Sequence, residues 1–222
     1  SVHLVVAEWL SVITSLGGAV CISKAVADDL AEWMETNASP RLRPFKIDWF
    51  HLGADVDNSA PTRGIPPDAD IVLDCLRSRP TFLTVGTLEP RKGHGQVLNA
   101  FEQLWRTGID LNLVIVGKQG WMVEALVDRL RMHPELNQRL FWLEGISDEY
   151  LEIIYTASTC LIAASYGEGF GLPLIEAAQH KLPIIARDIP VFREVAGEHA
   201  YYFEDESPDA LVQKIIDWVT LY

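Results

Sequence analysis

The chain has 222 residues, which is enough for one complete α/β core and part of another. Its formal net charge of −13 argues against binding a polyanion such as nucleic acid through bulk electrostatics, so any phosphate site must be built locally from a few cations and backbone amides. The three cysteines, Cys21, Cys75 and Cys160, are widely spaced, which argues against a disulfide framework or a zinc site and favours a reducing compartment.

The amino-terminal stretch is moderately apolar, but it contains Glu8 and two glycines and has no basic leader. This composition does not fit a signal peptide, and no apolar run in the sequence is long enough and free enough of charged residues to span a bilayer. We therefore expect a soluble, cytoplasmic protein that could still touch a membrane face.

The first eighty residues contain few regular elements. Ala19–Ser23 and Phe45–His51 are predicted strands, with a helix over Ala25–Glu35 between them, and the Pro- and Asp-rich stretch Asn58–Asp70 is typical of a linker. Two strands are too few for an independent core. This piece must therefore pack on the later domain or belong to another domain.

From Thr81 onward, short β-branched runs alternate with amphipathic stretches. The predicted strands are Thr81–Gly86, Leu111–Gly117, Arg139–Leu143, Thr159–Ala163, Leu182–Ala186 and Ala200–Phe203. The predicted helices are Gly95–Arg106, Val123–Met132, Asp148–Ala157, Leu172–His180, Val191–Ala196 and Pro208–Thr220. This alternation predicts an α/β fold with a Rossmann-like, doubly wound parallel sheet, which binds ligands at the carboxyl ends of its strands.

The segment GTLEPRKG, Gly86 to Gly93, directly follows the first of these strands. It delivers Arg91, a planar fork for phosphate oxygens, and Lys92, a mobile point charge, to a helix start that adds free amides and a positive dipole end. In a chain this acidic, the pair indicates an anion site. The alternative is a solvated turn in which both cations pair with surface acids.

A second segment, EGFGLPLIEAA, follows the fourth strand. Gly169 and Gly171 allow the backbone to approach a ligand, and Pro173 suits the first turn of a helix whose amino end would face an anion. Glu168 and Glu176 are separated by seven residues, and their carboxylates could accept hydrogen bonds from sugar hydroxyls. Alternatively, Glu168 faces water and Glu176 is an acidic residue favoured by the helix dipole.

In this order and at these strand ends, the two segments resemble the retaining GT-B glycosyltransferases that use nucleotide-sugar donors, and the resemblance covers roughly residue 23 to the end. It implies that Arg91 and Lys92 bind the donor diphosphate and that Glu168 contacts the donor sugar. Glu176 would bind the ribose, and Ile146 would lie where the nucleobase is read. The remaining donor-site residues that the resemblance implies are Gly86, Thr87, Gly169, Phe170, Gly171 and Leu172.

The resemblance also implies a division of the chain into the tail of an acceptor domain (1–56), an interdomain linker (57–80) and a donor-binding domain (81–222). The implied partners are a nucleotide-sugar donor and a glycan or lipid-linked acceptor, with no metal or other cofactor. By itself, this stretch should bind donor and turn over poorly, and contact with the inner membrane face would depend on the rest of the enzyme.

Two positions depart from the family pattern: Thr87 stands where many members carry arginine, and His180-Lys181 stands where a glycine commonly precedes the next strand. Stretches such as LVIVGKQGW resemble bacterial mannosyl- and rhamnosyltransferases of O-antigen, that is lipopolysaccharide, biosynthesis, which makes GDP-mannose the first donor to test.

Three alternatives remain: a sugar-nucleotide epimerase of the same architecture, a non-catalytic nucleotide-binding module, and a dinucleotide oxidoreductase. The last is disfavoured because GTLEPRKG lacks the glycine spacing of the dinucleotide fingerprint. His94 follows the basic loop, and of two roles, one facing the crevice and one at the surface of a helix start, the sequence favours the surface role.

Overall fold

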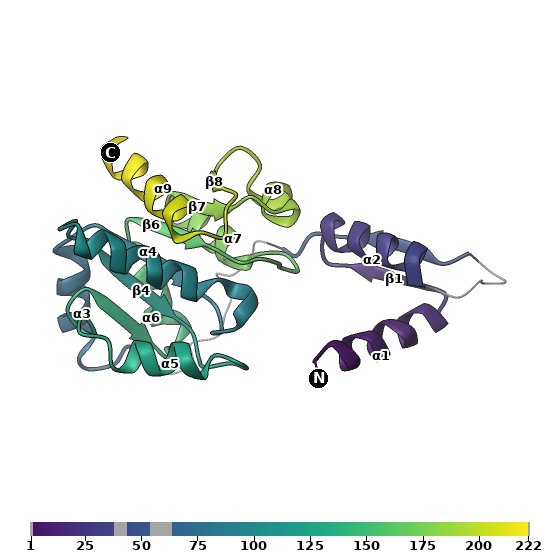
Figure 1. The fold of residues 1–222 in the computed structure, drawn as a ribbon, viewed down its shortest axis with the longest axis horizontal. Coiled ribbons are helices and arrows are strands. Elements are labelled where there is room, and N and C mark those ends of the chain that lie inside the picture. The colour runs from purple at the N-terminus through teal and green to yellow at the C-terminus, as the bar shows by residue number, and fades with distance from the viewer. Residues whose placement is uncertain (1, 38–43, 54–63, 222) are drawn as a thin grey trace. The chain divides into compact units, whose positions relative to one another are not determined.

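The computed structural model describes residues 2–37, 44–53 and 64–221. Contacts divide the chain into two units, one made of Ser1–Gly53 with Glu168–Phe170, the other of Ala54–Gly167 with Gly171–Tyr222. Figure 1 shows the elements of both units. The predicted α/β class, with a Rossmann-like parallel sheet preceded by a strand–helix–strand piece, is confirmed.

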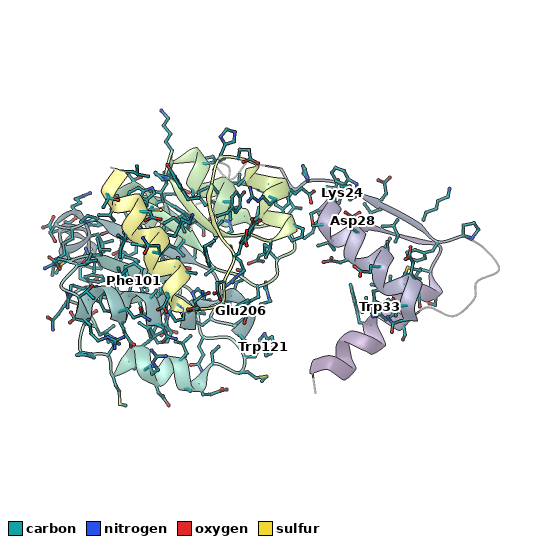
Figure 2. All side chains as sticks on the ribbon, turned by 45° about the horizontal axis from the view of Figure 1, so that its top comes forward. Lys24, Asp28, Trp33, Phe101, Trp121 and Glu206 are labelled. Carbon is teal, nitrogen blue, oxygen red and sulfur yellow. The ribbon has the colours of Figure 1, made fainter. Side chains whose placement is uncertain are left out.

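The first unit contains a small parallel sheet of two strands, β1 (Gly18–Cys21) and β2 (Lys46–Trp49). Helix α2 (Lys24–Asn37) joins them, and its Ala25 and Ala27 are buried. Lys24 donates to Asp28 one turn later on the same helix (Figure 2). Helix α1 (Val2–Ser15) precedes β1, where the sequence pattern predicted no helix.

The second unit is built on six parallel strands in the order β5-β4-β3-β6-β7-β8. The strands are β3 (Thr81–Val85), β4 (Asn112–Val116), β5 (Leu140–Leu143), β6 (Cys160–Ala163), β7 (Ile184–Arg187) and β8 (Tyr201–Phe203). The strand order reverses between β3 and β6, so the sheet has its topological switch point between these two neighbours.

Helices cover this sheet. They are α3 (Ala69–Arg77), α4 (His94–Arg106), α5 (Glu124–Arg131), α6 (Asp148–Ala157), α7 (Leu172–Gln179), α8 (Pro190–Ala196) and α9 (Pro208–Leu221), with a 3-10 turn η1 at Pro90–Lys92. Helix α4 packs beside α9, as Figure 1 shows, and α3 packs against α6. Helices α4 to α8 each follow one strand of the sheet and return the chain to the start of the next, as a parallel sheet requires.

Aromatic rings join α4, α9 and the central strand in the core. The ring of Phe82 meets those of Phe101 and Trp218 edge-on, with centroids 5.7 Å and 5.6 Å away, and Phe101 is labelled in Figure 2. Strands β3 and β4 are buried over nearly their whole length, which agrees with the continuous apolar runs in the sequence.

Helix α3 occupies part of the stretch that the sequence pattern assigned to a linker. Residues 57–63 of that predicted linker lie outside the described residues. Ala69, Leu73 and Leu76 recur at helical spacing and are buried, and Asn112 donates to the Cys75 carbonyl at 2.9 Å. This amphipathic period was masked by the Pro- and Asp-rich residues that precede it.

Candidate functional site

The loop after β3 brings Lys92 back toward the end of the strand. The chain passes Gly86, whose amide donates to the Val116 carbonyl of β4 at 2.9 Å, and then forms the turn η1. A Cβ atom built on Gly86 would lie 3.3 Å from Lys92 Nζ. The ammonium group therefore lies at the carboxyl end of β3, where the exposed Thr87 also follows the strand.

Gly93 ends the turn and begins α4. It has φ of +72°, and a Cβ atom there would lie 2.2 Å from the Ala164 carbonyl oxygen in the loop after β6. Only glycine combines this backbone conformation with so close an approach. The two loops are therefore in direct contact at adjacent strand ends.

Arg91 strengthens the same contact. Its carbonyl accepts from the Tyr166 amide at 2.7 Å, and its Nη1 donates to the Gly167 carbonyl at 3.1 Å. Its Nε lies 2.9 Å from Glu89 Oε2, so the pairing with a neighbouring acid that the sequence left open does occur. Arg91 thus holds the loop that leads to Glu168 as well as lying beside Lys92.

The second predicted segment is shared between the two units. Glu168, Gly169 and Phe170 group with the first unit, where Ser23 Oγ donates to the Gly169 carbonyl at 2.7 Å and the Phe170 ring lies 5.5 Å from that of His51. Gly171, with φ of +95°, and the exposed Leu172 begin α7 in the second unit.

Glu176 lies in the second turn of α7 and is tied to α6. Tyr155, whose side chain is fully buried, donates its hydroxyl to Glu176 Oε2 at 2.6 Å. Burial raises the pKa of the Glu176 carboxyl group, whereas the hydrogen bond from Tyr155 lowers it. Burial likewise raises the pKa of Tyr155, which keeps its hydroxyl protonated as a donor.

Ile146, the predicted nucleobase contact, is half-buried in the loop between β5 and α6, directly before the helix cap Ser147. Strands β3, β4 and β5 are parallel neighbours, so the loop that follows β5 lies at the same edge of the sheet as Lys92. Within the second unit, the predicted residues of the loops after β3, β5 and β6 therefore share one sheet edge.

The structure decides the burial of His94 and the backbone conformation of Lys181. The prediction that His94 is a surface residue is wrong, because its side chain is 1% exposed at the start of α4. At the departure from the family pattern after α7, Lys181 adopts φ of +55°, so this lysine takes the left-handed conformation that usually favours glycine.

Two residues around the site, Tyr155 and Arg187, were not identified from the sequence. Tyr155 looked like an ordinary core residue of a helix, and only the tertiary structure brings it to Glu176. Arg187, a buried cation, contacts the loop after β6, and its one available signal was a charge at the end of the apolar run Ile184–Ala186.

Within residues 2–37, 44–53 and 64–221, no group of three or more His, Cys, Asp or Glu side chains could hold a metal ion. In that same part of the chain, every helix is too short or too polar to cross a membrane.

Comparisons with known proteins agree with this architecture. The chain spans about a quarter of the length of the first curated relatives it matches. It is 52% identical over 217 residues to the serotype-specific mannosyltransferase WbdA of Escherichia coli, covering 96% of this chain and 27% of that protein. It is 32% identical over 122 residues to the O-antigen chain mannosyltransferase RfbU of Salmonella typhimurium, covering 54% of this chain and 33% of that protein.

Among solved structures, the alpha,alpha-trehalose 6-phosphate synthase of Burkholderia multivorans aligns with 97% of this chain and 54% of its own, at 14% identity and a TM-score of 0.74. The sucrose-phosphate synthase of Thermosynechococcus elongatus aligns with 95% and 51%, at 20% identity and a TM-score of 0.68. At these identities the likeness concerns the fold. The model of the family described as glycosyl transferases group 1 matches residues 76–222, and the chain belongs to that family.

Proposed function

We propose that the protein to which this chain belongs transfers a hexose, namely mannose, from a nucleoside diphosphate to a hydroxyl group of a glycan or lipid-linked acceptor, with retention of anomeric configuration. The observation that carries the proposal is the meeting of two loops at adjacent strand ends. Lys92 lies at the end of β3, and the contact between Gly93 and Ala164 brings that loop against the one that leads into α7.

Departure of a diphosphate from an oxocarbenium-like carbon is the difficult part of such a transfer. Fixed cations and backbone amides lower the barrier by stabilising the negative charge that grows on the leaving group. Lys92 and Arg91 supply the cations, and the amides of Gly171 and Leu172 at the start of α7 supply donors. In this proposal the fixed cations replace a metal ion.

The two acids take different roles. Glu168, with the backbone of Gly169 and Phe170, contacts hydroxyl groups of the donor sugar, and Glu176 binds the ribose. The hydrogen bond from Tyr155 supports the second role because it holds one carboxylate oxygen of Glu176 and leaves the other to accept. Ile146 contributes to the nucleobase pocket, and Gly86 and Thr87 line the donor.

GDP-mannose is the proposed donor. Support comes from the relatives WbdA and RfbU, both of which are named mannosyltransferases. We further propose that residues 1–56 are the tail of an acceptor domain, that 57–80 connect the domains, and that the enzyme works in the cytoplasm with peripheral contact to the inner membrane face.

A thermal-shift panel of GDP, UDP and ADP on this chain tests donor binding, and GDP should give the largest rise in melting temperature. A preference for UDP would contradict the GDP assignment, and no shift with any of the three would contradict the donor site itself.

Product analysis of the full-length enzyme then tests the reaction. Incubation with GDP-mannose alone should leave the sugar unchanged, whereas addition of a mannose-terminated glycan should release GDP and extend the glycan. Conversion of the donor without acceptor would indicate an epimerase instead.

A further inference from the structure

Arg187, the last residue of β7, is a buried cation whose acceptors are not carboxylates. Its side chain is 4% exposed. Nε donates to the Ala164 carbonyl at 3.1 Å and Nη1 to the Asp205 carbonyl at 3.2 Å, while Nη2 donates to Gln96 Oε1. Burial of an ionised group costs free energy unless its donors have hydrogen-bond acceptors. A buried arginine is therefore an expensive way to fill space, and its hydrogen bonds indicate a further role.

Two aromatic rings complete its surroundings. The guanidinium carbon lies 4.0 Å from the centroid of the Tyr166 ring and 5.1 Å from that of Phe203. Burial lowers the pKa of Arg187, whereas Tyr166, Glu206 and Asp205 raise it, and Glu206 is labelled in Figure 2. Ring faces and oxygen acceptors thus compensate for the lost hydration of the cation.

The acceptors of Arg187 belong to three separate segments. Ala164 and Tyr166 lie in the loop after β6, Gln96 lies in the first turn of α4, and Asp205 follows β8. Gln96 also donates its side-chain amide to the Asp205 carbonyl at 2.9 Å. A single guanidinium therefore joins the start of α4 to the loop that leads into α7.

These contacts bear directly on the proposed diphosphate site. The Ala164 carbonyl that Arg187 holds is the atom against which Gly93 packs. The Tyr166 amide, on the residue that carries the stacked ring, donates to the Arg91 carbonyl at 2.7 Å. Arg91 and Gly93, the residues on either side of Lys92, thus both contact the loop after β6, and Arg187 contacts the same loop.

We propose that Arg187 is a positioning residue for donor binding, which sets the spacing between the Arg91–Lys92 turn and the loop after β6. The inference rests on the proposed function, and the role it assigns to Arg187 is to position the groups that bind the diphosphate. Lysine cannot replace it, because one ammonium group lacks the planar fork that reaches three acceptors and stacks on a ring.

The test compares diphosphate and monophosphate binding by calorimetry, using GDP with GMP and UDP with UMP on this chain. Arg187→Lys should weaken binding of the preferred diphosphate about tenfold, as expected when charged hydrogen bonds are lost, and weaken its monophosphate less. The ratio of the two affinities should therefore fall. A merely structural role would leave that ratio unchanged.

Arg193→Lys is the matched control. Arg193 also pairs through its guanidinium, with Asp188 at 2.6 Å, and stacks on Tyr202 at 3.7 Å, but it is partly exposed on α8. Its substitution should leave both affinities unchanged. An Arg187→Lys protein with the wild-type affinity ratio would overturn the inference.

Tyr166→Leu provides a second variant in case Arg187→Lys does not fold. Tyr166 is 41% exposed, so its removal is tolerated, and it deprives Arg187 of its closest ring. The affinity ratio should again fall, by about threefold, and an unchanged ratio would overturn the inference. Wild-type protein that binds neither GDP nor UDP would instead contradict the proposed function, and the role of Arg187 would fall with it.

Discussion

The first unit pairs two strands of four residues each, whereas the second places six parallel strands side by side. In the first unit Val20 is 67% exposed, although it lies in the middle of β1. In the second unit every residue of β4 is buried. Both units alternate strands and helices, but among the described residues the large hydrophobic core belongs to the second unit. A sheet buries its faces only when enough strands and covering helices are present.

The difference extends to chemistry. Loops that follow neighbouring parallel strands meet at one edge, and the second unit has such a meeting between the loops after β3 and β6. Two short strands offer fewer converging loops. We therefore expect donor binding to depend on substitutions in the second unit much more than on equivalent substitutions in β1, α2 and β2 of the first.

The largest expected effect is on transfer activity. In the full-length enzyme, Lys92→Ala should lower the rate of transfer from GDP-mannose about 100-fold or more, because a fixed charge facing the leaving group is lost. Lys46→Ala in β2 of the first unit is the matched control and should retain wild-type turnover. Near-normal turnover of the Lys92 variant, measured by release of GDP, would remove the diphosphate role of Lys92.

The next effect concerns backbone geometry. Gly93→Ala should destabilise the protein by about 2–4 kcal/mol, because alanine is strained at positive φ and its methyl group would overlap the Ala164 carbonyl. At Gly17, in the first unit, an added Cβ would meet no atom within 4 Å. Gly17→Ala should change stability by less than about 0.5 kcal/mol. Urea unfolding of both variants checks this, and equal stabilities would show that the two loops are not tightly packed.

A pair of valines tests the cores themselves. Val114 in β4 is fully buried, and Val114→Ala should cost about 2–3 kcal/mol through lost burial and the cavity left behind. Val20→Ala in β1 should change stability by less than about 0.5 kcal/mol, because the side chain is mostly exposed. Circular dichroism during urea unfolding gives both values. A large cost at Val20 would mean that this face is covered in solution.

The smallest effect is a pH dependence at Glu176. Its folded-state pKa is raised chiefly by burial, so the stability it contributes is fully present below the unfolded-state pKa and is lost as the pH rises through the folded-state pKa. Glu176→Gln, which stays neutral, should therefore melt about 1–3 °C above wild type at pH 7.5, and the difference should vanish near pH 4.

The same Glu176 variant should bind GDP less tightly, since an amide accepts ribose hydroxyls more weakly than a carboxylate does. Glu32→Gln on α2 of the first unit is the exposed control for both measurements. A lower melting temperature for Glu176→Gln at pH 7.5 would show that the buried charge is compensated by its surroundings.

Sequence patterns predicted the regular elements of the second unit closely. Asp148–Ala157 has the predicted bounds, and β5 and α4 differ from prediction by one residue at one end. Hydrophobic periodicity and turn residues are local features of the sequence, so they predict helices and strands without knowledge of the tertiary structure. Helices α1 and α3 were missed because one lies in an apolar stretch without strong periodicity and the other follows Pro- and Asp-rich residues.

For the site, the sequence supplied the two motifs and their order along the chain. It could not supply the contact between Gly93 and Ala164, which joins residues far apart in the chain. The burial of His94 could not be predicted either, because the sequence does not show which neighbouring elements cover the start of a helix.

The sequence by itself determined the class of fold, the family and the residues that follow each strand, since these depend on local pattern and on motif spacing. Only the tertiary structure decided which groups support those residues: Tyr155 behind Glu176, and Arg187 behind the loop after β6. Hydrogen bonds to buried groups depend on distances of a few ångströms between segments that are remote in sequence, and no local pattern encodes them.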